Sequence, residues 1–156
     1  MDERNCAERA ANYFLEGYNC CQSVFLAFSD RYGIDRETAL KLSCSFGGGM
    51  GRMRQVCGAV SGMALVCGME TGNTDGKDKQ KKTENYGKMR RLAEAFREKN
   101  GSIVCGELLG LSGQAGNTEG AAPSDRTAEY YKKRPCKELV RCAAEILERE
   151  FPEKGA

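Results

Sequence analysis

The sequence predicts an all-α, single-domain bundle of about six to seven helices. Apolar residues recur at helical spacing along most of the chain, and no segment alternates with the two-residue period of a strand. A chain of 156 residues is typical of one domain, so we expect residues 1–156 to share one core. We expect the main helices over residues 3–17, 20–33, 36–46, 55–70, 78–99 and 135–150, and shorter ones over 102–110 and 125–133.

The helix boundaries follow from residues that start or stop helices. Asn19 and Asp35 are suited to cap the N-termini of the helices that follow them. Gly33 and Gly101 are suited to end a helix, and Pro135 suits the first position of the last one. The stretch between the last two short elements is small and polar, which predicts a flexible loop over residues 111–124.

The segment 55–70 is apolar nearly all round, so we expect it to be the central buried helix. Gly58 and Gly62 form a pair of small residues one turn apart within it. Such a pair permits the close approach of a neighbouring helix, at some cost in helix propensity.

Composition excludes several classes of protein. The formal net charge of +2 is too small to indicate nucleic-acid binding by itself, and no apolar run is long enough to span a membrane. The first ten residues lack the basic start and apolar stretch of a secretory signal, so we expect a cytoplasmic protein. We consider two kinds of partner, a redox partner protein and a second copy of this chain in a homodimer.

The composition is unusual in its nine cysteines, and the sequence contains no histidine. In a reducing compartment, so many cysteines indicate free thiols, a metal site or a redox pair rather than a disulfide scaffold. The lack of histidine excludes His-ligated zinc, Cys–His dyads and c-type haem attachment.

The most informative stretch runs from Cys44 to Cys67 and contains a glycine-rich turn. We expect Cys57 in the first turn of a helix near two arginines, a setting that favours its thiolate. The glycines allow positive φ and leave backbone N–H groups pointing outward. The residues of the turn that we expect to contact a cofactor are Gly48, Gly49, Gly51 and Arg52.

Three further cysteines lie at predicted helix starts or turns: Cys20, Cys105 and Cys136. Cys21 is adjacent to Cys20, and the two point about 100° apart on a helix, so at most one is expected to face a common site. For the remaining cysteines we expect no function. Cys6 is interpreted as a surface or edge residue, and Cys44 and Cys142 as core residues. Cys67 is too far from Cys57 along the helix to join the same site.

The motifs NCCQSVFLAF, SFGGGMGR, VCGAVSGMALVCG, CGELLG and PCKELVRCAAEILE together resemble the C_GCAxxG_C_C family over residues 17–148. Members of that family are described as redox-active proteins with four characteristic cysteines. By this resemblance the four are Cys20, Cys57, Cys105 and Cys136. Cys21 stands where the pattern usually has alanine, which leaves open which of Cys20 and Cys21 is the functional thiol.

Three hypotheses follow. In the first, the four cysteines bind an iron–sulfur cluster or zinc and carry electrons, since four thiolates without histidine suit such groups. In the second, two of them form a thiol–disulfide pair in a redox enzyme or sensor without metal. In the third, the chain is a non-catalytic binding module that uses the basic face of residues 77–99. Interspersed glutamates make a solvated face the preferred interpretation of that segment, and nucleic acid is not an expected partner.

Overall fold

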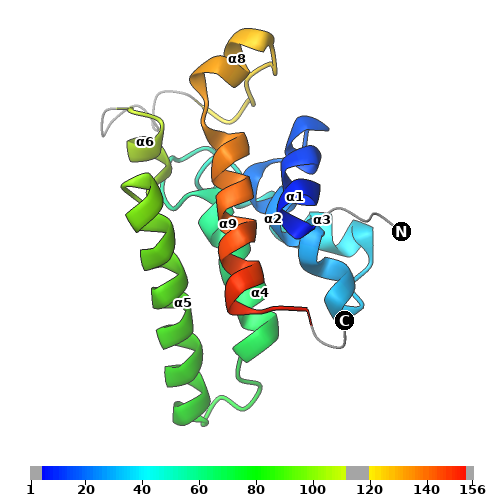
Figure 1. Cartoon of the computed structure of the whole chain (residues 1–156), viewed down its shortest axis with the longest axis vertical. Helices are drawn as coiled ribbons and strands as arrows, with labels where there is room; N and C mark the ends of the chain where they lie inside the picture. The colour runs from blue at the N-terminus through cyan, green and yellow to red at the C-terminus, as the bar shows by residue number, and fades with distance from the viewer. Residues whose placement is uncertain (1–4, 112–119, 154–156) are drawn as a thin grey trace.

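The computed structural model describes residues 5–111 and 120–153, and all its regular elements are helices (Figure 1). Most of the predicted loop over residues 111–124 lies outside this range. The helices are α1 (Cys6–Leu15), α2 (Cys20–Ser29), the 3₁₀ helix η1 (Asp30–Tyr32), α3 (Arg36–Cys44), α4 (Gly58–Thr71), α5 (Lys79–Asn100), α6 (Cys105–Leu108), α8 (Ala128–Lys133) and α9 (Cys136–Glu150). The prediction of an all-α bundle is therefore confirmed. No helix of the described residues has the length and apolar character needed to cross a membrane.

The predicted caps explain where the helices begin. The Asn19 side chain accepts a hydrogen bond from the backbone of Gln22, whose own side chain accepts one from the backbone of Asn19, which forms a capping box. Asp35 accepts a hydrogen bond from the backbone of Thr38 in the same way. Gly101 has φ +90° and ends α5 in the left-handed conformation.

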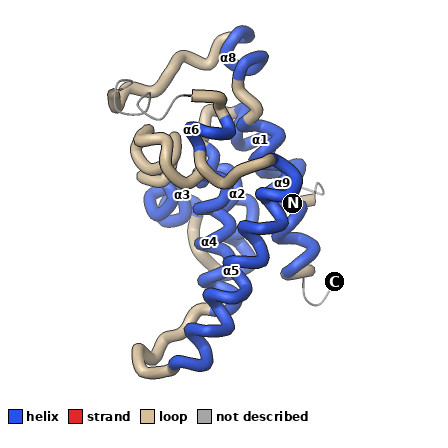
Figure 2. Tube along the Cα trace, turned by 90° about the vertical axis from the view of Figure 1, so that its left-hand side faces the viewer, coloured by secondary structure: helices blue, strands red, loops and turns tan. Residues whose placement is uncertain are grey.

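The most enclosed helix is α2, not α4 as the sequence predicted. Every residue of α2 from Ser23 to Ser29 is buried, because the helix packs against α1, α3, α4 and α9. Helix α4 packs against α2, α5 and α9, yet Ala64 and Met69 on its outer side are exposed. Both views show α4 and α5 as an antiparallel pair that extends away from the other helices (Figures 1 and 2).

Gly62 lets α2 and α4 approach closely, as predicted. A Cβ atom at Gly62 would lie 2.7 Å from the Cβ atom of Val24 and 3.3 Å from the carbonyl oxygen of Cys21. The contact therefore fixes the relative position of the two helices, and with it the positions of Cys20 and Cys57 at their N-terminal ends.

We expect Gly62→Ala to destabilise the protein by about 1–2 kcal/mol, because overpacking against Val24 outweighs the gain in helix propensity. Gly68→Ala is the matched control on the same helix, since a Cβ atom there would meet nothing within 4 Å. It is expected to stabilise by about 1 kcal/mol. Urea unfolding measures both, and equal effects of the two substitutions would contradict the close contact.

Candidate functional site

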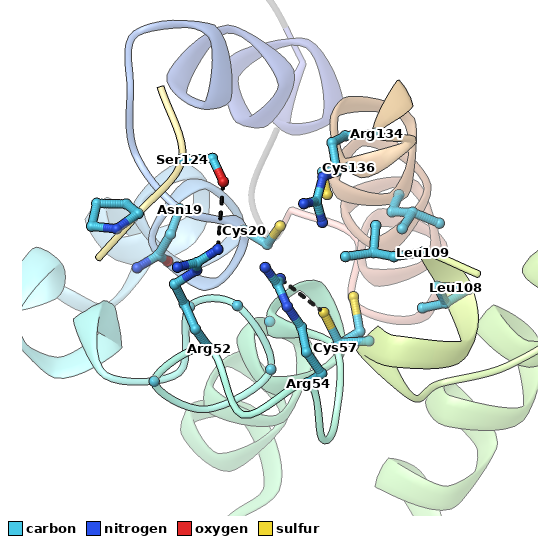
Figure 3. A pocket seen from close by; sticks show the side chains of 18 of the residues that line it. Asn19, Cys20, Arg52, Arg54, Cys57, Leu108, Leu109, Ser124, Arg134 and Cys136 are labelled. Carbon is cyan, nitrogen blue, oxygen red and sulfur yellow. Dashed lines mark hydrogen bonds between the residues drawn. The ribbon is translucent and has the colours of Figure 1, made fainter. Parts of the chain in front are cut away.

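A cavity of about 370 Å³ lies where the N-terminal ends of α2, α4, α6 and α9 meet (Figure 3). The four cysteines indicated by the resemblance all line it, although they come from four separate elements: Cys20, Cys57, Cys105 and Cys136. Gly48, Gly49, Gly51 and Arg52 line it too. The sequence therefore predicted correctly which residues gather in one place, while their chemical role stays a prediction.

A short backbone pairing, which the sequence did not reveal, brings Cys57 and Cys105 together. Val56 and Val104 form an isolated antiparallel bridge. Beside it, the N–H of Cys57 donates to Ile103 at 2.8 Å and the N–H of Cys105 donates to Gln55 at 2.6 Å. Because side chains alternate across an extended segment, the valines and the cysteines face opposite ways. Val56 is 42% exposed, and both cysteines are buried at the cavity.

The glycine-rich turn is more strained than its glycines alone suggest. Gly49 has φ +72°, and a Cβ atom there would lie 2.7 Å from the Cβ atom of Cys105. Arg52 and Arg54 also have positive φ, which is uncommon for residues other than glycine. Hydrogen bonds hold the turn, including the one from the N–H of Gln55 to the carbonyl of Gly49 at 2.9 Å. Strain of this kind is typical of functional sites, and here it points two arginine side chains at the cavity.

Four arginines line the cavity, and the sequence analysis placed two of them, Arg52 and Arg54, near Cys57. Arg52 fastens the segment 120–124 over the cavity through hydrogen bonds to the carbonyl of Ala122 and, at 3.4 Å, to the hydroxyl of Ser124 (Figure 3). Arg54 donates to the sulfur of Cys105 at 3.6 Å.

Arg126 and Arg134 are the two cavity arginines that the sequence analysis missed. Arg126 donates to the carbonyls of Phe14 and Tyr18 and lies 4.0 Å from the centre of the Phe14 ring. Arg134 lies over the ring of Tyr130. Arg134 could have been found from the sequence, because it is close to Cys136 in the chain. Arg126 could not, because tertiary contacts bring it to the cavity.

Cys136 is the thiol whose pKa the surroundings lower. The neighbouring Cys20 thiol is the largest cause, and the positive charges of Arg134, Arg54 and Arg126 add to its effect. Together they outweigh burial and lower the pKa of Cys136 to about 7. The interaction with Cys136, together with desolvation of the sulfur, raises the pKa of Cys20 well above its usual value. The two thiols therefore titrate as a coupled pair, in which the first proton leaves at a lowered pKa and the second at a raised one.

The thiolate expected at Cys57 is not supported. Cys57 is the N-cap of α4, as the prediction of a helix start implied, and the backbone of Ala59 and Val60 acts to lower its pKa. Burial is the larger effect, however, and raises the pKa of Cys57 to about 12. Cys105 shows a smaller rise for the same reason, opposed by Arg54.

The structure separates Cys20 from its neighbour Cys21. Cys20 lines the cavity, whereas Cys21 is fully buried in the core and does not. Desolvation raises the pKa of Cys21 strongly. Cys20 is therefore the member of the adjacent pair that is placed to react.

The positions of two other cysteines, Cys44 and Cys6, differ from those predicted. Cys44 was expected in the core, yet it is exposed and lines the cavity rim. Cys6 was expected at the surface, yet it is buried, and its sulfur accepts a hydrogen bond from Arg9 at 2.9 Å. Cys67 and Cys142 lie away from the cavity, as predicted.

The cysteines do not form a ready-made metal site. Among residues 5–111 and 120–153, no group of three or more cysteine, aspartate or glutamate side chains is arranged so that it could hold one metal ion. Four sulfur atoms on one cavity wall are the donor set that zinc or an iron–sulfur cluster requires, but coordination would need them to move closer together.

Several basic residues of α5 form ion pairs. Lys88 pairs with Glu150 of α9 at 2.6 Å, and Arg97 pairs with Glu94 one turn away at 2.7 Å. These contacts favour the interpretation of α5 as a solvated face.

Alkylation of Cys136 by iodoacetamide tests its acidity. Because only the thiolate reacts and its pKa is lowered, the rate should rise with pH and level off above about 7, instead of near the usual 9.0. Cys20→Ala removes the neighbouring thiol, the largest cause of the lowered pKa, and should move the midpoint to higher pH. Peptide mass spectrometry gives the rate at Cys136, and Cys142→Ala on the same helix is the control. A wild-type midpoint near 9.0 would contradict the assignment.

Comparison with known proteins agrees with the resemblance seen in the motifs. The family model described as "Putative redox-active protein (C_GCAxxG_C_C)" matches residues 18–150. Searches of curated proteins and of solved structures give no significant match.

Proposed function

Because the chain belongs to the C_GCAxxG_C_C family, whose description names redox activity, we propose that Cys136 and Cys20 form a thiol–disulfide redox pair. The observation that carries the proposal is that the two thiols line one cavity beside three arginines and shift each other's pKa in opposite directions. A thiol with a pKa near the ambient pH combines a large thiolate fraction with high intrinsic nucleophilicity. Cys136 therefore has the properties of an attacking thiol, and Cys20 those of a resolving thiol.

In the first step, the Cys136 thiolate attacks one sulfur of a substrate disulfide. A new sulfur–sulfur bond forms at Cys136 while the substrate's own bond breaks, and one substrate thiolate leaves with the electron pair. The leaving thiolate takes the proton of the neighbouring Cys20 thiol and becomes a neutral thiol.

In the second step, the Cys20 thiolate attacks the sulfur of Cys136 in the mixed disulfide. The Cys20–Cys136 disulfide forms, and the second substrate thiolate leaves and takes a proton from water. The protein loses two electrons in total and the substrate disulfide gains them. A second thiol compound or a redox partner protein then reduces the pair by the reverse exchange.

Trapping the mixed disulfide tests this assignment. Cys20→Ser removes the resolving thiol, so we expect the first step to occur and the adduct to persist at Cys136. Intact-mass analysis after incubation with a small disulfide would detect the adduct, which wild type should resolve. Cys21→Ser is the matched control and should behave as wild type. An adduct on another cysteine, with Cys136 unmodified, would contradict the roles.

A metal ion or iron–sulfur cluster is the second candidate, because the four cysteines share one cavity. Its presence would make the chain an electron carrier instead of a thiol–disulfide protein. Elemental analysis and an absorption spectrum of protein purified without oxygen distinguish the two. We expect no stoichiometric iron or zinc; one cluster or metal ion per chain, lost on Cys57→Ser, would favour the second candidate.

A further inference from the structure

The charge of the cavity lining is one-sided. Four arginines line it, and among the described lining residues none carries a carboxylate. The partners of Arg126 are two backbone carbonyls and two aromatic rings, and Arg134 packs over a ring, so these contacts do not cancel their charges. Arg126 and Arg134 therefore give the described lining a positive potential.

The size and the apolar part of the lining limit what can enter. A volume of about 370 Å³ lies at the lower end of the range of small-molecule sites, about 300–1,000 Å³. Leu108, Leu109 and Leu139 form an apolar wall of the cavity. A small molecule with a short carbon skeleton and negatively charged ends matches this combination better than a protein loop does.

We propose that the substrate of the Cys136–Cys20 pair is a carboxylate-bearing disulfide of low molecular weight, held by the guanidinium group of Arg134 next to the charge of Arg54. This inference rests on the proposed thiol–disulfide function and adds the substrate class. A guanidinium group binds a carboxylate through two parallel hydrogen bonds, so it fixes orientation as well as charge.

The same arginines assist the exchange step. When the Cys136 thiolate attacks, negative charge passes from its sulfur to the substrate sulfur that leaves. Arg134 and Arg54 are the two arginines that most lower the pKa of Cys136, so they lie where this charge moves. The electron pair and proton follow the two steps given above, and no further reactant is required.

Three disulfides of similar size and different charge test the substrate class. Dithiodipropionate is anionic, hydroxyethyl disulfide is neutral and cystamine is cationic. We expect the rate of Cys20–Cys136 disulfide formation to fall in that order, with the anionic compound about tenfold faster than the neutral one at low salt. The ratio should shrink as salt is added. Equal rates for the three compounds would overturn the inference and leave the thiol–disulfide function intact.

A substitution separates charge recognition from thiol reactivity. Arg134→Gln should lower the ratio of anionic to neutral rates toward one, and a ratio cancels any change in the reactivity of Cys136 itself. Arg90→Gln on the exposed side of α5 removes the same charge at a distance and should leave the ratio unchanged. An unchanged ratio in Arg134→Gln would count against its role.

Binding of an unreactive analogue makes the two proposals independently testable. Thiodipropionate has a thioether sulfur and cannot undergo exchange, and thiodiglycol is its neutral counterpart. Calorimetry should detect thiodipropionate binding to wild type, weaker binding to Arg134→Gln and weaker binding of thiodiglycol. Binding of thiodipropionate without reaction of any disulfide would contradict the redox function alone. No preference for thiodipropionate would overturn the anionic substrate.

Discussion

Replacing Cys136 by serine is expected to slow the reduction of small disulfides by at least about a thousandfold, because the attacking sulfur is lost. Serine has nearly the same size but does not ionise near neutral pH, so the fold should persist while the first step fails. Stopped-flow measurement of substrate thiol release gives the rate. The other eight cysteines remain, and most have raised pKa values through burial, so they should not replace Cys136.

Cys142→Ser is the control for this prediction. It lies on the same helix, contacts Asn100 and does not line the cavity. Its rate should equal that of wild type. A Cys136→Ser protein that retains the wild-type rate would show that a different thiol attacks.

Gly49→Ala is expected to destabilise the protein by about 2–4 kcal/mol. Two costs add at this position. The backbone has φ +72°, which alanine adopts with strain, and the new Cβ atom would lie 2.7 Å from Cys105 and from the backbone nitrogen of Gln55. Denaturant unfolding measures the loss, and surviving folded protein should show altered reactivity of Cys105.

Two other glycines separate these costs. Gly51 has φ +56° with nothing within 4 Å of a new Cβ atom, so Gly51→Ala should cost only the conformational part, about 1–2 kcal/mol. Gly87 lies within α5 with open space around it, so Gly87→Ala should stabilise by about 0.5–1 kcal/mol. If Gly49→Ala and Gly51→Ala had equal effects, the contact between the turn and Cys105 would be excluded.

Local signals in the sequence were sufficient for the helices. Asn19, Asp35 and Gly101 act at the positions where the sequence placed them, because capping depends on a few neighbouring residues. The close approach at Gly62 was predictable for a similar reason. The sequence did not predict which helix is most buried, because α2 is enclosed by other helices that its own sequence does not specify.

Four of the five cavity cysteines, all but Cys44, were predictable from motifs and helix starts, but their acidities were not. Helix position suggested a thiolate at Cys57, where burial dominates instead. The pKa of Cys136 depends on Cys20 and on Arg54, which are distant in sequence. Cys44 and Cys6 were misplaced because the exposure of a small apolar residue depends on which elements cover it.

The most direct test is to locate the disulfide that forms when reduced protein, kept free of oxygen, reacts with one equivalent of a small disulfide. Peptide mapping after rapid acid quenching and alkylation identifies the pairing. The account predicts a single disulfide between Cys20 and Cys136, with Cys57 and Cys105 recovered as free thiols. A disulfide between other cysteines, with Cys20 and Cys136 both still free, would contradict it.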